Sequence, residues 1–347
     1  MAFFRFNVLG LVVCCCLVFP ALSVAQSGDG NVMANHGPLP VHQRVLFFGS
    51  QEDQPAEQLL ATEKRLEGRH YVTCDEWYLH LLEPHIRDLG GGYAGVGTDQ
   101  AYLFIGWQKP HMAWLFDYDP WVKYLHQVYA VFFREAKTPE AFLKYFEYKN
   151  RKQIAKFLSE KLADNPEVKT IVRVFRANQD YIGRRLKRLI KSLRKAQVPC
   201  YLTDQEMYSF VRTLVMNGRV RPMLGDLLKD KGMQGMAKVG KQLGVPIRVL
   251  YLSNAEGYWK YPQQFKDNII SQFVDDKSVI LRTVAAKWTN GDYRYYVQKA
   301  TNFQEWMKRE WVNSYRQVVP MRKLKGKGDI PVTVVDRNPD ESAPKSK

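Results

Sequence analysis

The segment that decides the fold is residues 91–120, which read GGYAGVGTDQAYLFIGWQKPHMAWLFDYDP. It holds two short apolar pieces, one around Tyr93 and one at 112–116, and each has Gly or Pro close by, which is typical of strands. A glycine turn at 95–97 follows the first piece, and a stretch that could form a helix leads to the second. A strand, a glycine turn, a helix and a strand that ends in aspartates form the first half of many nucleotide-binding α/β folds.

The rest of the chain continues the alternation of strands and helices. Apolar, strand-like runs are VPCYL near 200, IRVLYLS from 247, SVILRTV from 278 and YRYYVQ from 293. Helical patterns at 204–243 and 256–273 lie between these runs. We therefore predict that residues 41–315 form an α/β domain, with a Rossmann-like, mostly parallel sheet and helices on both faces.

An added helical segment interrupts this alternation. From Pro120 onward, apolar residues recur at three- and four-residue steps, and the pattern continues to about residue 195. It breaks near Pro139 and near Pro166, where proline ends a helix or begins one. We predict a helical insertion at 136–197, and a further helix at 56–67.

The glycine turn is the first candidate binding site. Gly95 and Gly97 would let the backbone turn tightly and approach a ligand, and the N-terminus of the helix that follows would offer free N–H groups to an anion. Asp117 lies twenty residues after Gly97, the spacing at which an acid binds ribose hydroxyls in dinucleotide folds. Asp119 follows it. The alternative is structural, with Asp99 capping the first helix, and Asp117 and Asp119 the second.

The end of the run at 247–253 is the second candidate site. Ser253, Asn254, Glu256 and Tyr258 follow a strand at the edge where open α/β sheets bind ligands, so we place them on the substrate side. Ser253 or Asn254 could instead cap the next helix. The sequence contains neither an H-x-x-x-H nor an H-E-x-x-H pair, so we predict no metal site and assign no catalytic residue.

A basic helix is the third candidate. The segment IGRRLKRLIKSLRK has apolar residues along one helical face, and its cations include Arg184, Arg185, Lys187, Arg188 and Lys191. It could pack its apolar face on the core, with its basic face exposed to solvent. It could also bind an anionic membrane surface or a polyanion, which suits a chain with a formal net charge of +16. Nucleic acid is the less favoured partner for an exported chain.

The two ends of the chain are expected to lie outside the folded domain. Residues 1–25 combine an early Arg5, an apolar run shorter than a membrane span, and small residues at 23 and 25, as in a cleaved signal peptide. We expect export, periplasmic or secreted, after cleavage near Ala25, with a retained anchor or a lipoprotein as alternatives. Residues 26–40 are a predicted linker, and residues 316–347 a basic, disordered tail.

Several sequence blocks resemble an uncharacterised family of bacterial exported or envelope proteins. The blocks are GVGTDQAY from 95, LFDYDPWVKYLHQVYAVFF from 115, YLSNAEGYW from 251, VILRTV from 279 and DYRYYVQ from 292. That family is similar to the class I S-adenosylmethionine-dependent methyltransferases. The resemblance implies a seven-stranded Rossmann-like sheet, with Gly95 and Gly97 at the cofactor turn, Asp117 near the ribose, and Asn254 and Glu256 on the substrate side. Two positions depart from the methyltransferase pattern, because Tyr93 replaces an acid and Asp99 replaces a third glycine.

Two functions follow from these features. The first is a small-molecule pocket that uses S-adenosylmethionine, as in a methyltransferase. The second is a non-catalytic envelope protein that binds an anionic lipid or polyanion through its basic surface. The first depends on the glycine turn and Asp117, and the second on the basic helix.

Overall fold

The structure is a computed structural model that describes residues 36–60, 64 and 67–343. The expected signal peptide and most of the expected linker lie outside the described residues. Both hydrophobic cores and the whole sheet are built from residues within 36–343.

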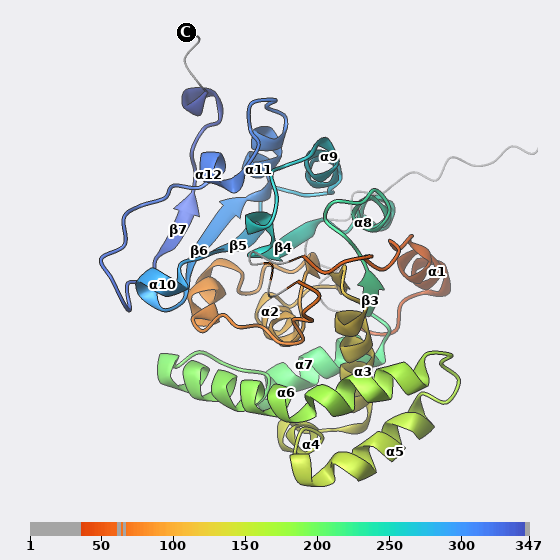
Figure 1. Ribbon diagram of the computed structural model, residues 1–347. Helices are drawn as coiled ribbons and strands as arrows, with labels where there is room; N and C mark the ends of the chain where they lie inside the picture. The colour runs from red at the N-terminus through yellow and green to blue at the C-terminus, as the bar shows by residue number, and fades with distance from the viewer. Residues whose placement is uncertain (1–35, 61–63, 65–66, 344–347) are drawn as a thin grey trace, which may run out of the picture. The chain divides into compact units, whose positions relative to one another are not determined.

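Seven strands form one mostly parallel sheet (Figure 1), in the order β3-β2-β1-β4-β5-β6-β7. The strands are β1 (Gly92–Gly95), β2 (Met112–Asp117), β3 (Val220–Leu224), β4 (Ile247–Ser253), β5 (Val279–Ala285), β6 (Tyr293–Lys299) and β7 (Val332–Val335). The first five are parallel, β6 is antiparallel to β5, and β7 is parallel to β6. The α/β prediction is confirmed, and the order 3-2-1-4-5 is that of a Rossmann-like fold.

The sheet separates two hydrophobic cores, one on each face. Successive residues of the central strands point to opposite faces, so that Tyr93 and Leu115 join one core while Ala94 and Trp114 join the other. The first core packs under α2 (Asp99–Gln108), α3 (Pro120–Glu135), α6 (Val168–Ala196) and α7 (Gln205–Met216). The second packs under α1 (Val41–Gly49), α8 (Gly232–Leu243), α9 (Gln263–Ser271) and α11 (Ala300–Met307), and Figure 1 shows α8, α9 and α11 across the sheet from α2, α6 and α7.

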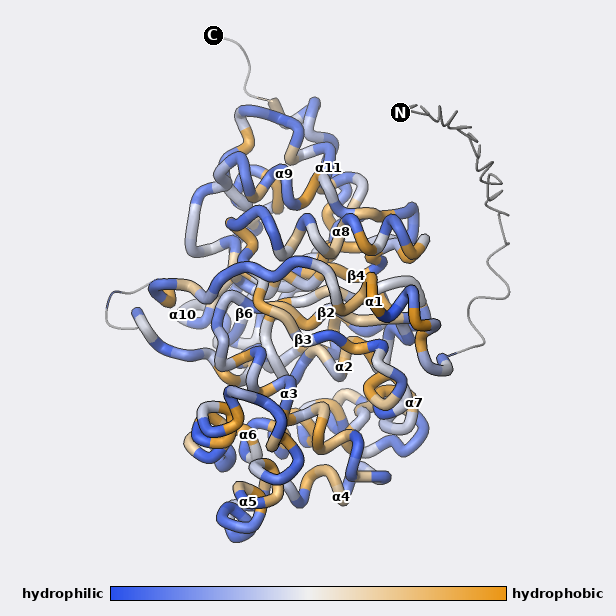
Figure 2. Tube along the Cα trace, turned by 90° about the vertical axis from the view of Figure 1, so that its right-hand side faces the viewer, coloured by the Kyte–Doolittle hydropathy of each residue, from blue (hydrophilic) through white to orange (hydrophobic). Residues whose placement is uncertain are grey.

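The predicted helical segment is helical. It consists of α4 (Pro139–Lys144), a short η3 (Tyr148–Asn150), α5 (Arg151–Lys161) and α6, which packs against α3 and α5. Proline stands at the first position of α4, and the Thr138 hydroxyl caps that helix by accepting from Ala141 N. In Figure 2 the α5 and α6 tubes alternate between hydrophobic and hydrophilic colour, as expected for helices with one buried face.

The remaining helices are short. They are η2 (Leu79–His85), η4 (Ala255–Gly257), α10 (Lys287–Asn290), α12 (Tyr315–Val318) and η5 (Asp340–Ser342). Two of them, η4 and α10, follow β4 and β5 at the carboxyl ends of the parallel strands.

Three secondary-structure predictions were wrong. VPCYL near 200 forms turns, because Cys200 O accepts the N–H groups of Thr203 and Asp204 as the chain leaves α6 and enters α7. The helix predicted at 204–243 is divided by a left-handed Gly218 and the edge strand β3, where Pro222 is tolerated. Residues 56–60 are not helical.

The tail prediction was also wrong for its described part. Strand β7 joins the sheet by pairing with β6, and the Trp306 indole donates to Arg337 O at 3.1 Å. The short sequence VTVV forms an edge strand because the backbone N–H and C=O groups at the edge of β6 are available to pair with it. Cys74 and Cys200 are both free thiols, so no disulfide joins them.

A buried ion pair ties the added helical segment to the sheet. Arg185 of α6 donates from Nε to Asp99 Oδ2 at 3.0 Å, and their side chains are only 4% and 0% exposed. The other carboxylate oxygen of Asp99 accepts Cys74 N at 2.8 Å, and Arg185 also reaches Glu76 O at 3.1 Å. The pair therefore joins α2, α6 and the segment at 74–76.

We expect Arg185→Met to lower the free energy of unfolding by about 3–5 kcal/mol, because it leaves the Asp99 carboxylate buried without a cation. Lys187→Met, on the exposed face of the same helix, should leave the urea midpoint almost unchanged. Urea unfolding followed by circular dichroism measures both. Equal losses for the two variants would show that the pair contributes nothing specific.

Candidate functional site

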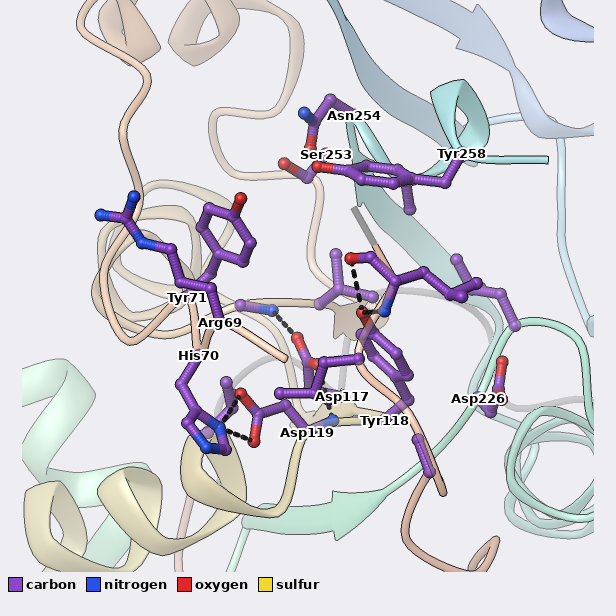
Figure 3. A pocket seen from close by; sticks show the side chains of 18 of the residues that line it. Arg69, His70, Tyr71, Asp117, Tyr118, Asp119, Asp226, Ser253, Asn254 and Tyr258 are labelled. Atoms are coloured by element: carbon purple, nitrogen blue, oxygen red, sulfur yellow. Dashed lines mark hydrogen bonds and ion pairs between the residues drawn. The ribbon is translucent and has the colours of Figure 1, made fainter. Parts of the chain in front are cut away.

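A cleft of about 1240 Å³ opens at the carboxyl ends of the parallel strands. It lies where the strand order reverses between β1 and β4, the position at which open α/β sheets bind ligands. Gly97 follows β1, Asp117 ends β2, and Ser253 ends β4, and all three line the cleft. Figure 3 shows Ser253, Asn254 and Tyr258 across the cleft from Asp117 and Asp119.

The glycine turn is held in place by side chains around it. Gly97 has φ +82°, and a Cβ there would lie 2.2 Å from Gln100 Nε2, so only glycine fits without strain. Gln100 Nε2 donates to Val96 O at 2.7 Å. Burial lowers the pKa of His126 to about 4, so its ring is neutral, and Nε2–H donates to Gly97 O at 2.8 Å while Nδ1 accepts from Tyr102.

Asp117 connects the ends of β1 and β2. Its Oδ2 accepts Gly97 N at 3.0 Å, and its Oδ1 accepts Asp119 N at 3.0 Å. Desolvation by burial raises the pKa of Asp117 to about 7, against the opposing effect of those backbone N–H groups. The backbone N–H of Tyr118 also acts on this carboxylate, but a carboxylate has about four lone-pair sites, so the group can still accept a donor from a ligand in the cleft.

Asp119 caps α3 and binds a histidine. Its carboxylate accepts Trp121 N at 2.9 Å, as the structural alternative predicts for a helix N-cap. Both carboxylate oxygens lie 2.9 Å from His70 Nδ1, and the His70 ring stacks on Trp121 with 3.5 Å between centroids. Asp119 lines the cleft, but its hydrogen-bonding capacity is largely used within the protein.

The end of β4 has an irregular backbone. An extra residue interrupts its pairing with β5 between Tyr251 and Ser253, and Ser253 has φ +51°, which is strained for a residue other than glycine. The Ser253 hydroxyl donates to Glu76 at 3.0 Å. Burial raises the pKa of Tyr258, so this phenol stays neutral and can donate a hydrogen bond in the cleft, where Asn254 lies beside it.

Three predicted site residues do not line the cleft. Gly95 packs against the core, where a Cβ would meet the Tyr93 ring and hydroxyl. Asp99 points into the core toward Arg185. Glu256 is buried against Tyr261 and Arg282, with Oε1 3.2 Å from Arg282 Nη1. The structure therefore brings together Gly97, Asp117, Asp119, Ser253, Asn254 and Tyr258.

One wall of the cleft was not predicted from the sequence. Segments 53–60 and 69–75 fold over the glycine turn, and they bring Arg69 and Tyr71 to the opening (Figure 3). Thr98 Oγ1 fixes the second segment by donating to Val72 O at 2.9 Å. The loop after β3 adds Asp226, and α10 adds Trp288. The aromatic and charged residues of RHYVTCDEWY could have indicated such a lining segment.

Only some of the cations predicted on the basic helix are exposed to solvent. Arg185, predicted as an exposed cation, is buried in the ion pair with Asp99. Arg184, Lys187, Arg188 and Lys191 are exposed, and Arg184 pairs with Asp180. Within the described residues, no helix is long and apolar enough to cross a membrane, and no cluster of His, Cys, Asp or Glu could hold a metal ion.

Comparison with known proteins identifies a family. The family described as a domain of unknown function, DUF7790, matches residues 71–331. The match contains strands β1 to β6, the glycine turn and the carboxyl edge of the parallel strands, and it ends immediately before β7. No curated protein matches the chain. Because the match covers well over half of its residues, the chain belongs to the DUF7790 family.

Proposed function

We propose that the cleft binds the adenosyl group of S-adenosylmethionine and that the protein transfers its methyl group to a second small molecule. The observation that carries this proposal is the position of Asp117, at the end of β2 and beside the glycine turn, with its carboxylate at the cleft. A carboxylate at this point of a Rossmann-like sheet is placed to accept the two hydroxyl groups of a ribose.

The residues of the cleft fit the ribose end of such a ligand. Asp117 is held rigidly by Gly97 N and Asp119 N, so little ordering of its side chain is needed on binding. The Gln100 side-chain oxygen is buried without a described partner, and Gln100 lines the cleft, so it offers a further acceptor. Gly97 lets the ligand approach the backbone closely.

The methionine part of S-adenosylmethionine must be bound by other residues than those of the usual methyltransferase pattern. Tyr93, at the position of the usual acid, is fully buried in the core, and Asp99, at the third glycine, is committed to Arg185. Arg69 at the opening of the cleft is an exposed cation that can pair with a carboxylate instead. We therefore assign the ligand carboxylate to the segment at 69–75.

The size of the cleft leaves room for a second ligand. Its volume of about 1240 Å³ exceeds the range of about 300–1000 Å³ that serves one drug-sized molecule. Methyl transfer from a sulfonium depends mainly on alignment of the acceptor with the methyl group. The Asn254 amide and the Tyr258 hydroxyl can orient an acceptor by hydrogen bonds on the β4 side.

The first test is a thermal-shift and calorimetric titration of residues 26–347 with S-adenosylmethionine, S-adenosylhomocysteine and adenosine. We expect saturable binding by the wild type and at least about tenfold weaker binding by Asp117→Asn, because a charge-assisted hydrogen bond to ribose is lost. Asp226→Asn is the matched control, since Asp226 also lines the cleft and also accepts a backbone N–H, from Leu228. Absence of binding by the wild type would refute the proposal.

Affinity for these ribose-containing ligands should rise with pH. Burial raises the pKa of Asp117 to about 7, so its ionised fraction grows from about one tenth at pH 6 to about nine tenths at pH 8. Only the ionised form accepts both hydroxyls, and we expect up to about tenfold tighter binding at pH 8 than at pH 6. Calorimetry at both pH values measures this, and Asp117→Asn should lack the dependence. A wild-type affinity that falls with pH would contradict the role of Asp117.

A further inference from the structure

We propose that the protein docks on anionic phospholipid bilayers through a surface formed by the exposed side of α6, the aromatic pair Trp77 and Tyr78, α10 and the loop at 322–328. We call this surface the α6–α10 face. It brings together two basic stretches far apart in the sequence. The proposal does not depend on which ligand the main cleft binds, although α10 borders both the cleft and this face.

A groove of about 590 Å³ lies at the centre of the α6–α10 face. Its lining includes Trp77, Tyr78, Ser192, Lys195, Asn290 and Lys327. The end of α6 thus meets the basic loop before β7, and Figure 1 shows this end of α6 below α10. Lys195 and Lys327 both carry exposed charge at the groove.

Large aromatic side chains are exposed in this groove and on α10 beside it. Trp77 and Tyr78 line the groove and are 43% and 38% exposed, while Trp288 on α10 is 96% exposed and lines the main cleft next to it. The backbone of Trp77 is fixed, since its O accepts from Ser192 Oγ at 3.0 Å, and Arg188 lies 5.3 Å from its ring centroid. Such rings, with an apolar body and a polar tip, are suited to the headgroup level of a bilayer.

The acidic groups beside this face are already partnered. Asp180 pairs with Arg184, Asp75 with Lys287, and Asp329 with Arg322. Asp292 is buried and accepts the Tyr295 hydroxyl at 2.7 Å. The exposed cations that remain include Lys187, Arg188, Lys191, Lys195 and Lys327, for which the structure describes no ion pair. The face therefore carries a net positive charge.

Helix geometry places these cations on one side. Lys187, Lys191 and Lys195 are spaced by four residues, so they follow one line along α6. The opposite side is buried in the first core through Ile182, Leu186, Leu189 and Leu193. A row of cations beside exposed tryptophans matches a surface that carries both negative charge and an apolar layer, which a bilayer provides and a soluble anion does not.

The test is flotation of residues 26–347 with vesicles of phosphatidylcholine alone or of an equal mixture of phosphatidylcholine and phosphatidylglycerol. We expect binding to the anionic vesicles only, weakened by salt. Lys195→Glu/Lys327→Glu should weaken this binding by about tenfold or more, because each cation is attracted to the anionic surface. Trp288→Ala should also weaken it, and its 96% exposure makes loss of the fold unexpected.

A matched control is Lys238→Glu/Lys241→Glu on α8, which makes the same charge change on two exposed lysines across the sheet. Retained binding by this control supports the α6–α10 face. An equal loss in the control would overturn the proposal, because only net charge would then matter. Equal flotation with neutral vesicles would overturn it too, as would tight binding to heparin or single-stranded DNA without binding to anionic vesicles.

Discussion

The ion pair between Asp99 and Arg185 is the interaction on which the site depends. Its two side chains are almost fully buried, and it joins the first residue of α2 to the middle of α6 and to the segment at 74–76. That segment continues from the part of the chain that covers the glycine turn, so the pair fixes one wall of the cleft. Because a buried ion without its partner is strongly unfavourable, α6 and the sheet cannot separate without cost. The added helical segment is therefore part of the site's frame.

The contact between Asp99 and Arg185 could not be predicted from the sequence. Asp99 was predicted to bind a cofactor and Arg185 to lie on a basic surface, because each residue was interpreted within its own segment. They are 86 positions apart, and nothing in either local pattern indicates their contact. The glycine turn, Asp117 and the end of β4 were predicted because strand, turn and spacing signals are local. The covering segments at 53–60 and 69–75 were missed because their positions depend on long-range contacts such as that of Thr98 with Val72.

Strand predictions failed for a related reason. The central strands β4 and β5 are nearly continuous apolar runs, since both faces of a parallel sheet are covered, and they were found. The edge strands β3 and β7 are short, and β3 contains a proline, so their patterns resemble a helix end or a polar tail. Each becomes a strand because a neighbour, β2 or β6, supplies the hydrogen-bonding edge. Edge strands are thus decided by the assembled sheet more than by their own residues.

The cleft and the α6–α10 face meet at α10. Trp288 lines the cleft, while Asn290 of the same short helix lines the groove. Asp75, which lines the cleft, binds Lys287 of α10 and accepts the Tyr293 hydroxyl of β6 at 2.8 Å. A shift in the position of α10 would therefore act on Asp75 in the cleft, because Lys287 of α10 forms an ion pair with Asp75. If the α6–α10 face docks on a bilayer, as we propose, α10 brings the rim of the cleft that holds Trp288 toward the same surface, and the methyl acceptor that we propose for the cleft could then be a molecule at the membrane surface.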